Sequence, residues 1–195
     1  LAQAGRRVLL VDTDLRRPRL HKAFEIRNER GVSNYLSGNE ADPTRLVVRT
    51  SLEHLDLLPS GPIPPNPSEL LSSERMQGLL ALLRESFDFV VIDMPSTLVS
   101  WTETVLHSAQ VYFSLLELDM RSAQNTLRFL RLLKGEDMPI EKLRFALNRS
   151  PGFTDLQGKA RVKRMAESLD IDIELLLPDG QKQVMQACDH GLPLA

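Results

Sequence analysis

Short apolar runs alternate along this sequence with longer stretches whose apolar residues recur at helical spacing. The runs within 7–12 and 87–93 are continuous and rich in β-branched residues, which is typical of strands covered on both faces. Further strands are predicted at 54–60, 109–118, 142–149 and 171–178, and helices at 69–87 (with Ser68 as N-cap), 121–135, 157–169 and 181–190. Strands separated by helices predict a three-layer α/β fold, with a mostly parallel sheet and helices on both faces.

Length and composition limit the class of protein. With 195 residues, 42% of them hydrophobic, the chain can bury a sizeable core, so we expect a single domain over 1–195. A net charge of −2 gives no support for binding nucleic acid. The only cysteine, Cys188, excludes an intrachain disulfide and suits a reducing cytoplasm. No apolar run approaches the roughly 18 residues of a transmembrane segment. We expect a cytoplasmic protein, which partners would recruit to the inner face of the membrane.

The first residues read as the end of an element. Leu1 is not a Met, and LAQAGRR has the pattern of a last helical turn that ends at Gly5. No signal peptide is visible. We therefore expect the chain to be a fragment that begins inside a helix.

Acidic residues stand at the ends of two predicted strands. Asp12 and Asp14 lie at and just past the end of the first strand, and Asp93 ends the strand at 87–93. Ligands of open α/β sheets bind beyond the carboxyl ends of strands. Carboxylates held together there suit Mg²⁺, which prefers oxygen ligands and keeps waters that a carboxylate can orient. The alternative is that each acid caps a helix or begins a turn.

The motifs resemble a known superfamily. RRVLLVDTDLRRP resembles the Walker A′ segment of MinD/ParA P-loop ATPases, and FDFVVIDMP resembles their Walker B strand. DLRRPRLH, GVSNYLSG and LPSGPIPPNPSELL resemble bacterial tyrosine kinases of capsule and exopolysaccharide systems. From Asp93 onward the sequence is more similar to pilus-assembly ATPases of the CpaE/TadZ type. The resemblance implies a domain that binds ATP and Mg²⁺.

The resemblance also implies roles for the three acids. Asp12 matches the Walker A′ acid that positions magnesium or the attacking water, and Asp14 matches the second acid of that motif. Asp93 matches the Walker B acid, which holds magnesium through a water. Asp12 and Asp14 are therefore the expected catalytic residues, and Asp93 and Asp12 the expected metal residues.

A second group of residues matches the nucleotide-base site. Asn148, followed by Arg149 in LNR, matches the position that hydrogen-bonds adenine, and Pro178 and Asp179 match the loop that packs beside the base. An amide offers a donor and an acceptor together, as one edge of adenine requires. The alternative for Asn148 is a turn residue after a strand.

The phosphate-binding loop of the superfamily is missing from the sequence. No glycine-rich loop followed by Lys and Ser/Thr occurs. In the superfamily this loop, and the strand before it, precede the Walker A′ strand by one helix. We expect both to lie outside this sequence, and we expect the sheet edge beside 7–12 to be unpaired and hydrophobic.

Three functions are compatible with these features. The favoured one is a positioning ATPase of a pilus or secretion apparatus that dimerises with ATP between its subunits. The alternatives are a protein-tyrosine kinase of the polysaccharide-export machinery and a non-catalytic scaffold. Transfer to tyrosine needs an accessible acceptor. Tyr112 is expected to be buried in a strand and Tyr35 to be exposed, and no tyrosine-rich tail is present, which favours the ATPase.

The arginines after Asp14 allow two interpretations. Arg16, Arg17 and Arg19 could contact an acidic partner or nucleotide phosphates across a subunit interface, because guanidinium groups bind such anions bidentately. The alternative, which we favour, is a solvated surface cluster.

Overall fold

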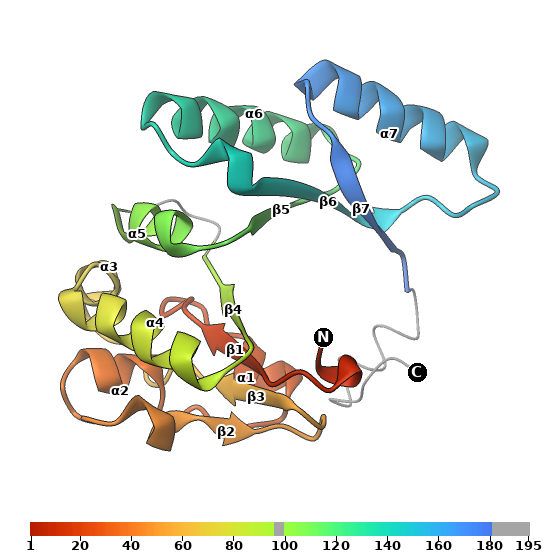
Figure 1. The fold of residues 1–195 in the computed structure, drawn as a ribbon. Helices are drawn as coiled ribbons and strands as arrows, with labels where there is room; N and C mark the ends of the chain where they lie inside the picture. Colours follow the sequence, from red (N-terminus) through yellow and green to blue (C-terminus); the bar gives the residue numbers. More distant parts are fainter. Residues whose placement is uncertain (96–99, 181–195) are drawn as a thin grey trace. The chain divides into compact units, whose positions relative to one another are not determined.

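The computed structural model describes residues 1–95 and 100–180 (Figure 1). Within the described residues, the chain divides into two compact units, one up to Thr102 and one from Glu103 to Gly180, and each is described by itself. The prediction of a single domain therefore stays a prediction. The helix expected at 181–190 lies outside the described residues.

The first unit contains a four-stranded sheet in the order β2-β3-β1-β4. β1 (Val8–Asp12) pairs in parallel with both β3 (Leu55–Leu58) and β4 (Phe89–Asp93), and the two-residue β2 (Val48–Arg49) is antiparallel to β3. These pairings confirm three predicted strands.

The expectation of an unpaired edge beside 7–12 is wrong, because β1 has a partner on each side. Two of its residues, Leu9 and Val11, are completely buried, as the continuous apolar run predicted. β4 is instead an edge strand of this sheet, and its residues Phe89 and Val91 are 41% and 42% exposed. The apolar pattern of β1 thus reflects its position between two neighbouring strands, in the interior of the sheet.

The helices of the first unit are short, except for one. They are α1 (Leu20–Ala23), α2 (Val32–Leu36), α3 (Pro67–Leu71) and α4 (Glu74–Ser86), together with the 3₁₀ turns η1 (Ala2–Ala4) and η2 (Pro43–Leu46). The single helix predicted at 69–87, with Ser68 as its N-cap, is wrong. Asn66 precedes the first helical residue of α3, Pro67. The Ser73 hydroxyl donates to the Leu70 carbonyl at 2.6 Å, which ends α3 and leaves Ser73 as the N-cap of α4.

The second unit contains a fully parallel sheet in the order β5-β6-β7. Its elements are α5 (Ser100–Ser108), which begins in the first unit, β5 (Tyr112–Leu116), α6 (Met120–Gly135), η3 (Ile140–Lys142), β6 (Leu143–Ser150), α7 (Leu156–Leu169) and β7 (Ile173–Pro178). Figure 1 shows α6 and α7 on the same face of this sheet, as two right-handed crossovers in one direction require.

Both long helices of the second unit begin at an aspartate N-cap. Asp119 accepts from the Ser122 N–H at 2.7 Å, and Asp155 accepts from the Gly158 N–H at 2.8 Å. Leu133 of α6 is completely buried. These parallel strands and crossover helices confirm the predicted α/β fold class.

Candidate functional site

The carboxyl ends of β1 and β4 bring the predicted metal-site acids together. Asp12 and Asp93 are register partners on the two neighbouring strands. Thr13 continues the connection, because its hydroxyl and its N–H both donate to the Asp93 carbonyl oxygen, at 2.5 and 3.1 Å. Thr13 is completely buried, and sequence reasoning missed it. The signal available in the sequence was a threonine placed between two acids at the end of a strand.

Asp12 is a buried carboxylate held by the backbone. Its Oδ1 accepts from the Asp14 N–H and its Oδ2 from the Leu20 N–H, both at 3.2 Å. Burial, together with the charges of Asp93 and Asp14, raises the pKa of Asp12 to about 6, although the two backbone hydrogen bonds act to lower it. At neutral pH Asp12 is therefore an ionised carboxylate whose charge is poorly stabilised.

Asp14 and Asp93 are more accessible. Asp14 is half-buried, and its Oδ1 accepts from the N–H groups of Arg16 and Arg17 at 3.2 and 2.9 Å, so the turn interpretation also holds for this acid. Asp93 is exposed as a residue, but protein atoms partly surround its carboxyl group. This partial desolvation, with the charge of Asp14, raises the pKa of Asp93.

The acids fit a magnesium ion that keeps most of its waters. Within residues 1–95 and 100–180, none of the three forms an ion pair with a basic side chain. Over the same residues, no three His, Cys, Asp or Glu side chains are placed to enclose a metal. Mg²⁺ is usually bound by one or two carboxylates together with phosphates and waters. Asp12 and Asp93 supply such a pair, with uncompensated negative charge.

The arginines of the following loop are exposed, which agrees with the favoured interpretation of a solvated cluster. Arg16 donates from Nη2 to the Ser68 hydroxyl at 2.9 Å and so links this loop to the start of α3. Arg17 and Arg19 have no carboxylate partner in the part of the chain that the structure describes.

The predicted base-site residues lie together at the carboxyl edge of the second unit's sheet. Leu147 pairs with Leu176 and Ser150 with Pro178, so β6 has one residue more than β7 between these two pairs. The extra residue is a β-bulge at Asn148 and Arg149, and Arg149 has a φ of 51°. Bulges redirect side chains and are frequent beside functional sites.

Asp179 follows directly after β7 at the same edge. Asn148, Arg149, Pro178 and Asp179 are thus gathered in one unit, while the three acids lie in the other. Sequence analysis did not identify Glu117, whose carboxylate accepts a hydrogen bond from Asn148 Nδ2 at 3.5 Å. The roles of Asn148, Arg149, Pro178 and Asp179 in binding a nucleotide stay predictions.

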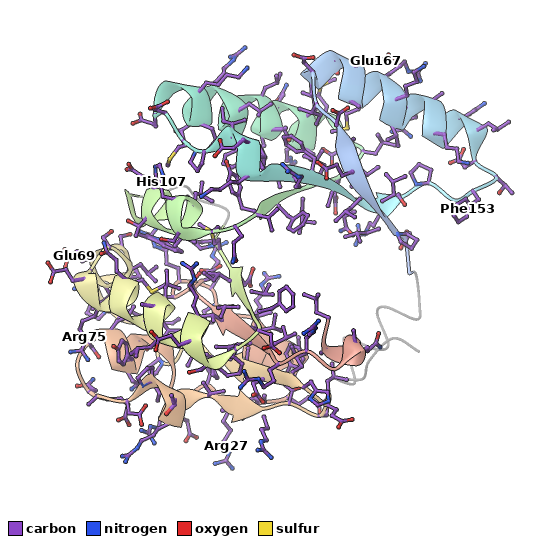
Figure 2. All side chains as sticks on the ribbon, in the orientation of Figure 1. Arg27, Glu69, Arg75, His107, Phe153 and Glu167 are labelled. Carbon is purple, nitrogen blue, oxygen red and sulfur yellow. The ribbon has the colours of Figure 1, made fainter. Side chains whose placement is uncertain are left out.

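Neither tyrosine is presented to solvent. Tyr112 is 9% exposed, its hydroxyl donates to the Pro139 carbonyl at 3.1 Å, and burial raises its pKa to about 12. This confirms the expected burial. Tyr35 is only 8% exposed, so the expectation that it is accessible is wrong. The guanidinium carbon of Arg75, a residue labelled in Figure 2, lies 4.9 Å from the centre of the Tyr35 ring and covers it. The two residues are 40 positions apart in the sequence, so the local sequence pattern does not reveal this contact.

The fold and the acidic strand ends define the class of protein. No family model matches the chain. It has the fold of the MinD/ParA superfamily of P-loop ATPases: the septum site-determining protein MinD from Pyrococcus horikoshii, solved with Mg-ADP, superposes with a TM-score of 0.76 over 99% of this chain and 76% of that one, at 19% identity. The kinase domain of Escherichia coli tyrosine kinase ETK superposes with a TM-score of 0.54 over 92% and 57% of the two chains, at 28% identity.

By sequence, the chain is homologous to bacterial tyrosine kinases. It is 43% identical over 97 residues to tyrosine-protein kinase YwqD of Bacillus subtilis, covering 50% of this chain and 40% of the relative. It is 31% identical over 151 residues to the putative tyrosine-protein kinase CapB of Staphylococcus aureus, covering 77% of this chain and 60% of that protein. The chain thus spans less than two thirds of these relatives. They do not support the CpaE/TadZ-like resemblance of the second half, which stays a prediction.

The described residues contain no helix that is both long and apolar enough to cross a bilayer. Localisation in the cytoplasm stays a prediction.

Proposed function

We propose that this chain is the nucleotide-binding part of a magnesium-dependent protein-tyrosine kinase, in place of the pilus-positioning ATPase that the sequence favoured. The observation that carries the proposal is the pair Asp12 and Asp93 at neighbouring strand ends, in a chain homologous to tyrosine kinases. The sequence resemblance supports a role for such a kinase in capsule or exopolysaccharide export. The comparisons support this alternative better than pilus assembly.

The acids have distinct parts in this proposal. When bound, Mg-ATP supplies the phosphoryl group and the positive charge that offsets the carboxylates. Asp12 and Asp93 would hold the metal and orient its waters. Asp12 is the more constrained of the two, because two backbone N–H groups hold its carboxylate. Asp14 orders the loop through Arg16 and Arg17.

The acceptor tyrosine is not one of the two in this sequence. Tyr35 and Tyr112 are both buried, and in-line transfer needs a hydroxyl that can reach the γ-phosphate. The acceptor is therefore on another polypeptide segment or on another molecule.

Phosphate mapping tests the proposal. The full-length native protein is incubated with Mg-ATP, and phosphorylated residues are mapped by mass spectrometry. We expect stoichiometric phosphotyrosine that persists when Tyr35 and Tyr112 are both changed to Phe. We expect none in Asp12→Ala. Release of inorganic phosphate without any phosphotyrosine would contradict the kinase.

Release of inorganic phosphate without phosphotyrosine is the outcome that a second candidate function predicts. A MinD-like switch, which dimerises with ATP between subunits and hydrolyses it, is favoured by the burial of both tyrosines and by the fit to MinD over 99% of the chain. Sedimentation with and without ATP separates this candidate from the scaffold, which would show neither hydrolysis nor nucleotide-dependent dimers.

A further inference from the structure

Glu117 lies just past the carboxyl end of β5, beside the base-site residues. Leu116 pairs with Leu147, so Glu117 and Asn148 are the next residues along two neighbouring strands. The Glu117 Oε1 accepts from Asn148 Nδ2 at 3.5 Å and lies 4.0 Å from Arg149 Nη1. The backbone N–H of Glu117 donates to the Ser122 hydroxyl at 2.9 Å. The start of α6 thus fixes the residue that faces the Asn148 amide.

The chemistry of the pair fixes how the amide is presented. A carboxylate accepts hydrogen bonds and cannot donate, so only the NH₂ group of Asn148 can face Glu117. A flipped amide would place its oxygen against the carboxylate. One N–H of Asn148 is therefore committed to Glu117, and a single N–H and the Oδ1 acceptor remain for a ligand.

This remaining pattern matches adenine and not guanine. Adenine presents the acceptor N7 beside the donor N6–H₂, which one N–H and one carbonyl oxygen pair together. Guanine presents two neighbouring acceptors, N7 and O6, at the same edge. An unrestrained amide could turn both N–H groups toward guanine, whereas an amide with one N–H committed to Glu117 cannot.

We propose that Glu117 is a positioning residue that restricts Asn148 to one donor and one acceptor and thereby sets the preference for adenine over guanine nucleotides. This inference rests on the proposed function, in which the chain binds ATP, and on the role in adenine binding that the family resemblance implies for Asn148. The competing view is that Glu117 only forms an ion pair with Arg149. Both side chains are largely exposed, at 49% and 68%, and such pairs contribute little to stability.

Base selectivity distinguishes the two views. The affinities of the full-length native protein for Mg-ATP and Mg-GTP are measured by calorimetry. Glu117→Met keeps the length of the side chain and removes the acceptor, while Glu117→Gln keeps an oxygen that can accept. We expect Glu117→Met to lower the ratio of ATP to GTP affinity about tenfold and Glu117→Gln to retain most of it. Glu174→Ala, which breaks the Arg144–Glu174 ion pair of 3.2 Å on the same sheet, is the matched control and leaves the ratio unchanged.

A second measurement needs no nucleotide. The side-chain amide signals of Asn148, assigned by their loss in Asn148→Ala, are followed by NMR in the nucleotide-free protein. We expect Glu117→Met to shift them and Glu174→Ala to leave them in place.

These measurements distinguish failure of the proposed function from failure of the role proposed for Glu117. A wild-type protein that does not bind Mg-ATP overturns the proposed function and this inference with it. A wild type that prefers ATP, with the same preference in Glu117→Met, overturns the role of Glu117 alone. Equal losses of ATP and GTP affinity in Glu117→Met would identify a merely structural residue and also overturn it.

Discussion

Thr13 joins the ends of β1 and β4 through a single acceptor, the carbonyl oxygen of Asp93. Its hydroxyl donates at 2.5 Å and its N–H at 3.1 Å. The last register pair of the two strands is Asp12 and Asp93, so this double contact closes the ladder immediately beyond the two acids. Without it, two carboxylates on adjacent strand ends would be free to separate under their mutual repulsion.

Thr13→Val tests this connection. Valine keeps the shape of threonine and removes the hydroxyl donor, so we expect the free energy of unfolding to fall by about 1 kcal/mol. We also expect weaker Mg-ATP binding in the full-length protein, because the spacing of the acids relaxes. Urea unfolding and calorimetry measure the two effects.

The control for this change is Thr126→Val. Thr126 is also buried, and its hydroxyl donates at 2.9 Å to the Ser122 carbonyl within α6. A similar or smaller loss of stability with unchanged nucleotide affinity is expected there. Equal losses of nucleotide affinity in both variants would show that the Thr13 contact has no special relation to the acids.

The raised pKa of Asp12 predicts how stability depends on pH. Its folded-state pKa of about 6 exceeds the ordinary value of 3.8, so the protonated carboxyl group favours the folded state. This stabilising contribution is complete below about pH 4 and is lost as the pH rises through 6. The difference corresponds to about 3 kcal/mol. The raised pKa of Asp93 acts in the same direction.

Asp12→Asn isolates this effect. The asparagine loses one acceptor of backbone hydrogen bonds at every pH, a constant cost of about 1 kcal/mol, but it carries no charge. Relative to the wild type, its free energy of unfolding should therefore rise by about 2 kcal/mol between pH 4 and pH 7 in magnesium-free buffer, which is most of the full difference. Urea unfolding at both pH values measures the change, and a constant difference between the two proteins would contradict a raised pKa.

Substitutions of the two metal-site acids, Asp12 and Asp93, should impair different steps. In the full-length native protein, Asp12→Ala should abolish phosphoryl transfer, because it removes the backbone-held carboxylate that would position the metal and its waters. Asp93→Ala should chiefly weaken magnesium-dependent binding of ATP, because its more exposed carboxylate holds the metal and its waters. Magnesium titrations of ATP affinity, together with single-turnover rates, separate the two. Wild-type behaviour in both variants would identify them as capping residues.

The features that could be predicted from the sequence were those that depend on residues close together in the chain. A continuous apolar strand such as Val8–Asp12 is encoded locally, and the acid that ends it could be placed at a sheet edge from parallel topology alone. The same pattern predicted Asp93, whereas Asn148 was assigned from the family resemblance. The neighbours of β1 depend on pairing between segments far apart in the chain, and there the expectation of an unpaired edge was wrong.

Side-chain contacts were less predictable than strands. Arg75 of α4 contributes to the burial of Tyr35, because its guanidinium group lies over the ring and its Nε also donates to the Tyr35 carbonyl at 3.0 Å. The break between α3 and α4 depends on the Ser73 hydroxyl, in a stretch whose apolar spacing continues through it. Glu117 was missed because its position opposite Asn148 follows from strand register, which a sequence read alone does not give.

A last prediction concerns the loop that closes on α2. The N–H groups of Val32 and Ser33 each donate at 2.8 Å to the carbonyls of Pro59 and Ser60, so the start of α2 lies directly against the loop after β3. A Cβ on Gly31 would come 2.0 Å from the Pro59 oxygen and 2.4 Å from the Gly61 nitrogen, both backbone atoms that cannot turn aside.

Gly31→Ala should therefore destabilise the protein strongly. The clash must separate α2 from the loop, and we expect a loss of about 3 kcal/mol or more in the free energy of unfolding. Gly78→Ala is the matched control: Gly78 is exposed within α4, a Cβ there meets nothing within 4 Å, and the higher helix propensity of alanine should stabilise by up to about 1 kcal/mol. Urea unfolding of both variants measures the opposite signs. A Gly31→Ala protein as stable as the wild type would show that α2 does not pack on this loop in solution, and the close approach of GVSNYLSG to LPSGPIPPNP would then have to be rejected.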